Sequence, residues 1–121
     1  MTGVQTCALP ISTIIQSTYR AALNSFSKCI AIENAAFGIT ANTICPGFFD
    51  TPLVERLSKE IASKENKNSE EVLYDWCNLS PYGKLGDPSD LGSYVAFLCS
   101  NMGKFINGRS NVIDGGALKS Y

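Results

Sequence analysis

Apolar residues near the start of the chain recur with the period of a helix. Between Ser12 and Ala36 they fall at steps of three and four residues. They are Ile15, Tyr19, Ala22, Phe26 and Ile30. This spacing places them on one helical face and predicts a helix of about 25 residues. Gly38 is expected to stop it, because glycine readily adopts the left-handed conformation that ends helices.

Two short segments carry the pattern of strands instead. Ile39–Cys45 is rich in β-branched residues and ends at Pro46-Gly47, which predicts a short buried strand. Ser110–Asp114 predicts a second strand, which is left through Gly115-Gly116. More than a dozen residues separate the two, so we expect parallel neighbours joined by a right-handed connection.

Three amphipathic helices are predicted between these strands. Thr51 and Pro52 provide an N-cap and a first helical position, and the polar stretch Ser63–Asn68 is expected to interrupt that helix. The next helix carries Val72, Trp76 and Leu79, and the last follows the cap of Asp87-Pro88. Trp76 and Leu79 either line a pocket or pack inward, and an apolar stripe on a helix favours inward packing.

The expected sheet indicates where a site would lie. In open parallel sheets, ligands bind outside the carboxyl ends of the strands. This places the candidate site at Pro46-Gly47 to Thr51 and at the Gly115-Gly116 turn.

Composition narrows the classes of function. The 121 residues are 45% apolar and carry 10 Lys+Arg against 11 Asp+Glu, which fits one domain and argues against a nucleic-acid partner. The longest apolar run, Tyr94–Cys99, is too short to cross a membrane. Histidine is absent, which excludes Ser-His-Asp catalysis and zinc sites with imidazole ligands, and we expect no metal.

The five cysteines form no C-x-x-C pair, so a zinc or disulfide framework is not expected. Four of them have apolar neighbours, as in Ile44-Cys45-Pro46 and Leu98-Cys99. We expect these four to be reduced thiols in the core of a cytoplasmic protein. A redox role is the alternative.

The first residues have a different character from the rest. Residues 1–11, MTGVQTCALPI, show no periodicity and no basic region of a signal peptide. They resemble the translation of a sequencing-library adapter. We therefore assign residues 1–12 to a non-native segment and treat residues 13–121 as the folded part.

Motifs along this part resemble the C-terminal half of a short-chain dehydrogenase/reductase. The landmarks are Arg20-Ala21-Ala22-Leu23, Gly38 to Gly47 (GITANTICPG), Thr51, Gly86-Asp87-Pro88, Ala96 to Ser100 (AFLCS), Gly108 and Asp114-Gly115-Gly116. The resemblance implies an α/β fold, the C-terminal part of a Rossmann-type doubly wound parallel sheet. It also implies that NAD or NADP is the cofactor of the complete protein, with Pro46 and Gly47 beside the nicotinamide and Thr51 at its carboxamide. A plain strand-to-helix turn with a capped helix is the alternative interpretation of these three residues.

The chain departs from the family at the catalytic pair. The family uses a tyrosine and a lysine four residues later, and alignment on Ala21-Ala22-Leu23 puts Gln16 and Arg20 at those positions. Tyr19 has no lysine or arginine four residues on, and no Tyr-x-x-x-Lys occurs in the chain. This divergence resembles a subgroup similar to 3-oxoacyl-carrier-protein reductases. Arg20 retains donors for ribose hydroxyls, or both residues are simply solvated or face another subunit.

Two other elements of the family, its catalytic serine and its glycine-rich phosphate loop, are not recognisable in residues 13–121. The catalytic serine would lie within the adapter-like segment, and Gly3 is the only glycine before Gly38, so no glycine-rich phosphate loop is present. The first hypothesis is a fragment of an NAD(P)-dependent oxidoreductase acting on a carbonyl or alcohol, inactive alone and a homo-dimer or homo-tetramer when complete. The alternative is a non-catalytic binding or scaffolding relative. Phe26, Tyr94 and Val95 are the expected subunit contacts by resemblance.

Overall fold

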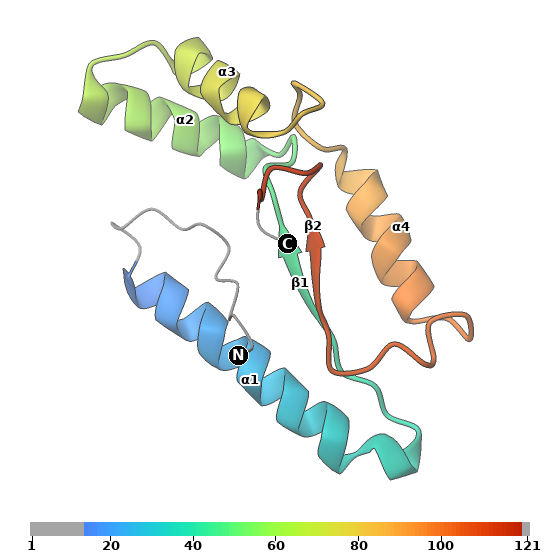
Figure 1. Cartoon of the computed structure of the whole chain (residues 1–121). Coiled ribbons are helices and arrows are strands. Elements are labelled where there is room, and N and C mark those ends of the chain that lie inside the picture. The colour runs from blue at the N-terminus through green and yellow to red at the C-terminus, as the bar shows by residue number, and fades with distance from the viewer. Residues whose placement is uncertain (1–13, 120–121) are drawn as a thin grey trace. The chain divides into compact units, whose positions relative to one another are not determined.

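The computed structural model describes residues 14–119 (Figure 1). The elements along the chain are α1 (Ile14–Glu33), η2 (Ala35–Phe37), β1 (Thr43–Pro46), α2 (Pro52–Glu65), α3 (Ser69–Leu79), α4 (Pro88–Leu98) and β2 (Ser110–Ile113). Within this range the residues form two compact units, one of 14–45 and 95–112 and the other of 46–94 and 113–119. The adapter-like residues 1–12 lie outside the described residues.

The two strands are paired in parallel, as the sequence predicts. In the first unit, the backbone N–H of Thr43 donates to the carbonyl of Arg109 at 2.9 Å. In the second unit, the N–H of Gly47 donates to the carbonyl of Ile113 at 2.8 Å, so both strands advance in the same direction. The prediction of an α/β fold with parallel neighbours is confirmed.

Strand β1 is shorter than predicted, because side-chain amides replace the sheet ladder before it. The Asn42 amide donates to the carbonyl of Ile106 at 2.8 Å and accepts from the N–H of Arg109 at 3.1 Å. Asn107 accepts from the N–H of Ala41 at 2.9 Å and donates to the carbonyl of Ala31 at 2.9 Å. Of the backbone in the predicted first half of the strand, the N–H of Ala41 is thus satisfied by a side chain, and its carbonyl accepts from the N–H of Gly108 at 2.8 Å.

Helix α1 also ends earlier than predicted. It stops at Glu33, and the short helix η2 follows, closed by Gly38 with φ of 73°. The apolar face predicted for α1 is exposed: Ile15 is 72%, Tyr19 74% and Phe26 62% exposed, whereas only Ala31 is buried on this helix. The helix is therefore amphipathic, but the described residues of its own unit, 14–45 and 95–112, leave its apolar face uncovered.

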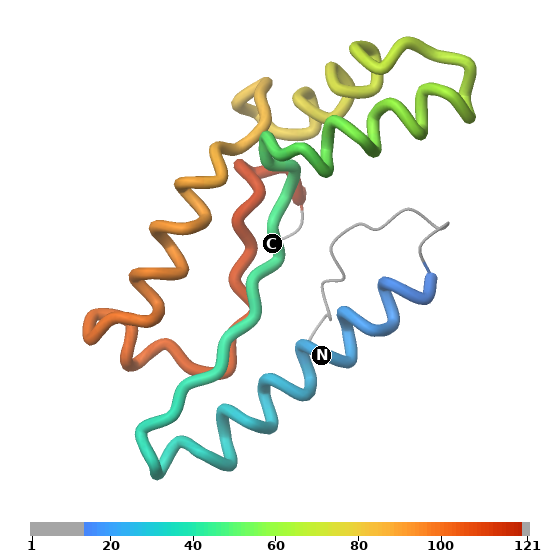
Figure 2. Tube along the Cα trace, turned by 180° about the vertical axis from the view of Figure 1, so that it is seen from behind, coloured from blue at the N-terminus to red at the C-terminus, as the bar shows by residue number. Residues whose placement is uncertain are grey.

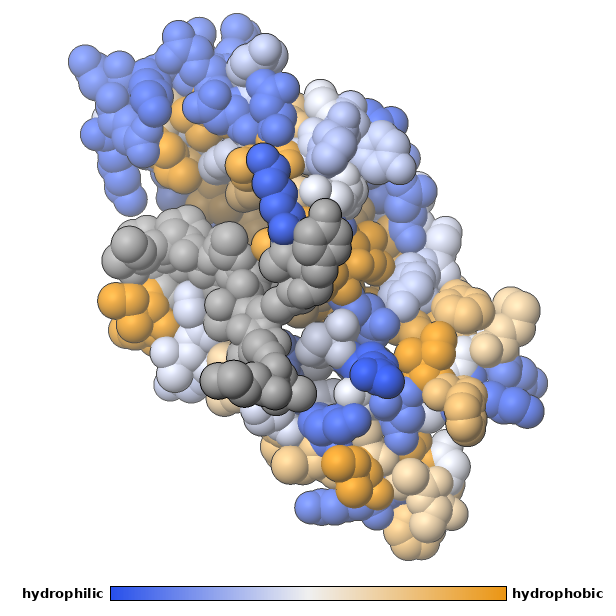
Figure 3. Space-filling view, in the orientation of Figure 1, coloured by the Kyte–Doolittle hydropathy of each residue, from blue (hydrophilic) through white to orange (hydrophobic). Residues whose placement is uncertain are grey.

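In the second unit, α2 and α3 pack side by side (Figures 1 and 2). Small buried side chains on α2, Ser58 and Ala62, allow the close approach of Val72 on α3. Figure 3 shows a mainly hydrophilic surface over this pair. Helix α2 continues through the predicted interruption to Glu65, where Asn66 with φ of 54° ends it. The predicted helix pair is confirmed, but its first helix ends later than predicted, at Glu65.

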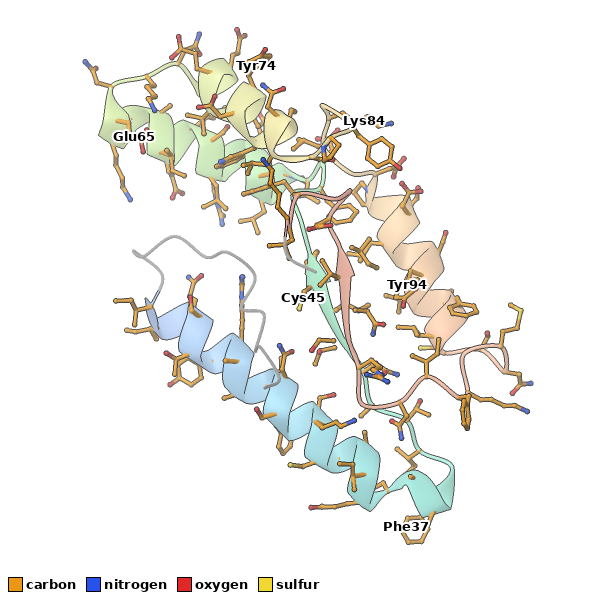
Figure 4. All side chains as sticks on the ribbon, viewed as in Figure 1. Phe37, Cys45, Glu65, Tyr74, Lys84 and Tyr94 are labelled. Carbon is orange, nitrogen blue, oxygen red and sulfur yellow. The ribbon has the colours of Figure 1, made fainter. Side chains whose placement is uncertain are left out.

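The predicted core position of the cysteines is wrong for those in residues 14–119. Cys29 and Cys99 are exposed, and Cys45 on β1 (Figure 4) and Cys77 are partly exposed free thiols. The buried apolar residues of the described range are few, so no deep core is available for them. They are Ala31, Phe49, Val54, Ala62 and Val72. None of the helices in residues 14–119 is long and apolar enough to span a membrane.

Candidate functional site

The end of β1 lies directly against the end of β2. A Cβ atom added to Gly47 would lie 2.8 Å from the Cα of Asp114, closer than real contacts allow. Only glycine therefore fits where the two strand ends meet in the second unit. The sequence interpretation attributes Gly47 to close approach of a ligand, but its closest described neighbour is this chain's own backbone.

Asp114 organises the turn that follows β2. Its carboxylate accepts from the N–H of Gly116 at 2.9 Å and from the N–H of Leu118 at 2.8 Å. The Ser80 hydroxyl, just after α3, donates to the carbonyl of Gly115 at 2.8 Å. The predicted Gly115-Gly116 turn thus adjoins the Pro46-Gly47 turn. Sequence reasoning missed the role of Asp114, although the Asp-Gly-Gly motif was visible.

Gly86 contacts the same loop, between Gly47 and Thr51, through Phe49 and Asp50. Phe49 and Gly86 form a parallel β-bridge, and the N–H of Asp50 donates to the carbonyl of Gly86 at 2.9 Å. A Cβ on Gly86 would lie 2.7 Å from the Phe49 ring. The segment between Gly47 and Thr51 therefore lies between two glycine contacts, at each of which an added Cβ would come closer than 3 Å to its neighbour.

Thr51 begins α2 as the sequence predicts. Its backbone is extended, with φ of −138° and ψ of 154°, and its hydroxyl oxygen accepts from the N–H of Val54 at 3.4 Å. A hydroxyl that accepts one bond still carries its own hydrogen as a donor. Thr51 is partly exposed and Pro46 is exposed at the strand end. The strand end therefore offers an exposed apolar ring, that of Pro46, and a hydroxyl donor, that of Thr51.

A pocket of about 550 Å³ lies beside this loop, within the second unit. It is lined by Phe48, Phe49, Asp50, Trp76, Leu79, Ser80, Tyr82, Lys84, Leu85, Gly86, Asp87, Pro88, Asp90, Ile113, Asp114, Gly115 and Ala117. The rings of Phe48 and Trp76 stack with centroids 4.7 Å apart and planes 9° apart. Leu79 is 50% exposed, so the preference for inward packing of this residue is wrong. Pro46, Gly47 and Thr51 are not among its lining residues.

Asp87 caps α4 and is one of the residues that line this pocket. The backbone N–H of Ser89 donates to its carboxylate at 2.8 Å, and this bond lowers the pKa of Asp87 below its ordinary value. The Ser89 hydroxyl and the charge of Lys84 add to this lowering of the pKa. Lys84 lies on the loop between α3 and α4 (Figure 4). Asp87 is therefore a carboxylate near neutral pH.

The other predicted site residues belong to the first unit. Gln16 and Arg20 lie one turn apart on α1, and both are exposed. The second unit holds Pro46, Gly47 and Thr51 together. The structure thus brings together three of the five predicted positions in one unit and the remaining two in the other. Within residues 14–119, no group of three or more acidic or cysteine side chains could hold a metal ion.

Comparison with known proteins identifies the family. The family model described as enoyl-(acyl carrier protein) reductase matches residues 5–117. The chain belongs to the short-chain dehydrogenases/reductases. A short chain dehydrogenase family protein from Francisella tularensis superposes with a TM-score of 0.85 at 26% identity, over 93% of this chain and 47% of that one.

Two further relatives show the same partial coverage. Oxidoreductase UcpA of Escherichia coli K12 is 36% identical over 98 residues, which are 81% of this short-chain dehydrogenase/reductase chain and 36% of UcpA. L-sorbose reductase from Gluconobacter frateurii, solved with NADPH and L-sorbose, has a TM-score of 0.80 at 29% identity, over 89% of this chain and 41% of that one. The chain therefore spans less than half the length of these relatives. The Rossmann-type architecture expected from the sequence is confirmed.

Proposed function

We propose that this chain forms part of an NAD(P)-dependent oxidoreductase that moves a hydride between a nicotinamide and a carbonyl or alcohol substrate. The observation that carries the proposal is the contact between the ends of β1 and β2, with Gly47 pressed against Asp114 and Thr51 starting α2. Ligands of open parallel sheets bind at such strand ends. The NADPH bound to L-sorbose reductase supports the same class of cofactor.

Each predicted residue has a physical role in this proposal. The exposed ring of Pro46 offers a surface for the nicotinamide, and the Thr51 hydroxyl offers a donor to its carboxamide. The Arg20 guanidinium, exposed on α1, offers several N–H donors for ribose hydroxyls. When bound, the cofactor supplies or accepts the hydride. Gln16 cannot supply the proton, because an amide does not titrate near neutral pH.

We infer that residues 1–121 alone are inactive. Losing a general acid typically lowers the rate by a factor on the order of 10² to 10⁴. No glycine occurs between Gly3 and Gly38, so the chain offers no glycine-rich loop for the cofactor phosphates. We therefore also expect no NAD(P) binding by the isolated chain, and saturable binding of NADH or NADPH in calorimetry would overturn that expectation. NADPH-dependent carbonyl reduction by the isolated chain would overturn its inactivity.

A non-catalytic binding protein is the second candidate. It is favoured by the Gln16 and Arg20 positions, since no Tyr-x-x-x-Lys occurs in the 121 residues. In either case we propose that the complete protein is a homo-dimer or homo-tetramer, with Phe26, Tyr94 and Val95 at subunit contacts. We also propose a cytoplasmic location, because the four described cysteines are free thiols.

One pair of substitutions distinguishes the two candidates. In a full-length protein that contains this chain, Gln16→Tyr with Arg20→Lys should raise NADPH-dependent carbonyl reduction on the order of 10²-fold or more if the reaction was lost with the pair. Arg20→Lys alone is the matched control and should give no such gain. If the parent protein already turns over and the double variant does not change it, another group donates the proton. If neither protein binds NAD(P)H, the oxidoreductase proposal fails.

Thr51 provides a separate test of the cofactor position. Thr51→Val removes the hydroxyl and should weaken NADPH binding to the full-length protein by roughly threefold to tenfold, the value of one hydrogen bond. Thr51→Ser keeps the hydroxyl and should retain binding. Equal affinities of the two variants would remove Thr51 from the proposed site.

A further inference from the structure

The side chain of Asn107 joins three segments of the first unit. Asn107 lies in the loop between α4 and β2 and is partly buried. Its amide oxygen accepts from the N–H of Ala41, before β1, at 2.9 Å. Its amide nitrogen donates to the carbonyl of Ala31, near the end of α1, at 2.9 Å. Figure 1 shows these segments at one end of the strand pair. We call this contact of Asn107 with Ala31 and Ala41 the α1 clasp.

The α1 clasp lies where α1 is buried. Helix α1 ends at Glu33, so the carbonyl of Ala31 belongs to the last turn, whose carbonyls have no partner within the helix. Asn107 supplies the missing donor. Ala31 is 2% exposed and is the only buried residue of α1. Gly108 packs beside it, because a Cβ added to Gly108 would lie 3.2 Å from that of Ala31, and the N–H of Gly108 donates to the carbonyl of Ala41 at 2.8 Å.

A helix held near one end transmits a change of direction to its other end. Arg20 lies about three turns of α1 before Ala31, or about 16 Å along the helix axis. A tilt of about 5° at the α1 clasp therefore moves the backbone at Arg20 by about 1.4 Å. In an enzyme site, a misplacement of about 1 Å can lower the rate by a factor on the order of 10². The α1 clasp can therefore affect a site that it does not contact.

We propose that Asn107 is a positioning residue, which sets the direction of α1 and so places the Arg20 guanidinium for the cofactor. Asn107 acts through the helix rather than by contact with the cofactor. Its two amide groups suit this role, because one binds the helix and the other binds the segment that leads into β1. The inference rests on the proposed function, in which Arg20 binds the ribose hydroxyls.

Asn107→Asp breaks one half of the α1 clasp and keeps the size of the side chain. One oxygen still accepts from the N–H of Ala41, but an acceptor replaces the donor that faces the carbonyl of Ala31. Asn101→Asp is the matched control, because Asn101 is an exposed asparagine of the same loop and the change of charge is identical. Circular dichroism shows whether each variant keeps its helices. If Asn107→Asp does not fold, Asn107→Ala, which adds no charge, replaces it with the same expectations.

Binding of NADPH to the full-length protein that contains this chain is measured by calorimetry. Asn107→Asp should weaken binding by roughly threefold to tenfold, and Asn101→Asp should leave it unchanged. In the background of Arg20→Ala, Asn107→Asp should cause no further loss, because the group that it positions is already absent. A merely structural role would weaken binding equally with and without Arg20. Additive losses, or parent affinity in folded Asn107→Asp, overturn the proposal.

Hydrogen exchange of the same full-length proteins tests the α1 clasp without the cofactor. Asn107→Asp should speed exchange of the backbone amides in the last turns of α1 by roughly tenfold, and Asn101→Asp should not. A parent protein that binds NADPH, together with unchanged exchange in Asn107→Asp, overturns the α1 clasp alone. A parent protein that binds no NADPH overturns the proposed function, and the role of Asn107 toward the cofactor fails with it.

Discussion

At the scale of single residues, the geometry of the β1 loop depends on the absence of two side chains. Gly47 meets the backbone of Asp114 and Gly86 meets the Phe49 ring, and at both positions a Cβ would be closer than 3 Å. Neither glycine is required by a positive φ. The small size of Gly47, rather than its flexibility, therefore allows the two strand ends to approach, and that of Gly86 makes room for the Phe49 ring.

Gly47→Ala should destabilise the chain by about 1 to 3 kcal/mol, because the added methyl group overlaps backbone that cannot move without breaking the sheet pairing. Gly92→Ala in α4 is the matched control: nothing lies within 4 Å of its added Cβ, and alanine favours a helix, so this variant should be neutral or more stable. Urea unfolding followed by circular dichroism measures both. Equal stability of Gly47→Ala and the parent would show that the strand ends can separate freely.

The charge of Asp87 should make the start of α4 sensitive to acid. Its pKa is lowered in the fold by the N–H of Ser89, so its contribution to stability is present above the unfolded pKa of about 4 and is lost as pH falls through the lower folded value. Asp87→Asn keeps a capping oxygen without the charge and should lack this component. Asp90→Asn leaves the bond from Ser89 in place and should keep it.

Thermal unfolding between about pH 2 and 6 measures this component as the difference between the parent and Asp87→Asn. The parent should lose more stability than the variant below about pH 4. Parallel pH curves for the two proteins would mean that the capping bond is equally strong in both protonation states.

Sequence reasoning succeeds at residues whose partners are close along the chain. The Thr51 and Asp87 caps follow from local chemistry, because each bonds to a backbone N–H two or three residues ahead. The role of Asp114 toward Gly47 depends on the pairing of distant strands, and no local pattern specifies it. The stacking of Phe48 on Trp76 was missed for the same reason, since the two rings meet only after the intervening helices fold.

At the scale of elements, the α2–α3 pair depends on small residues at its contact. Ser58 is fully buried, and its hydroxyl donates to the carbonyl of Glu55 at 2.8 Å within its own helix. The buried group is therefore satisfied without help from α3. This makes side-chain size, rather than polarity, the property that position 58 must keep.

Ser58→Leu should destabilise the helix pair by about 1 to 3 kcal/mol, because a leucine does not fit the contact without moving α3. Ser58→Ala should change stability little, because it removes the buried hydroxyl together with the requirement that this hydroxyl be hydrogen-bonded. Ser63→Leu, an exposed position of the same helix, is the control for helix propensity. Chemical unfolding measures the stability of the three variants. An unchanged stability of Ser58→Leu would indicate that α3 can move away from α2 at little cost.

Element boundaries show where sequence patterns lose precision. The periodicity identifies each helix, but polar residues do not end one: α2 runs through Ser63 because lysine and glutamate are good helix formers, and it stops only at Asn66. The predicted strand Ile39–Cys45 loses its first half to the amide bonds of Asn42 and Asn107. Those bonds join segments far apart in the chain, so no local pattern could predict them.

At the scale of the whole molecule, the main consequence of the fold is the exposed apolar face of α1. Its period predicts a buried face, and family resemblance implies further sheet strands in the complete protein. Over residues 14–119, however, Ile15, Tyr19 and Phe26 remain more than half exposed. Aligned apolar side chains on one helix form a continuous patch, and such patches on isolated chains promote association.

The isolated chain should therefore self-associate through α1. Tyr19→Lys with Phe26→Lys places charge in the middle of the patch and should shift the chain toward monomer by roughly tenfold or more in dissociation constant, the effect of about 1.4 kcal/mol. Phe105→Lys is the matched control: Phe105 is 99% exposed but lies in a loop, so removing this single ring should change association little. Sedimentation velocity over a range of concentrations measures all three proteins. A parent chain that stays monomeric at the highest concentration would mean that the α1 face does not mediate association. Phe105→Lys acting as strongly as the α1 variant would place the contact elsewhere.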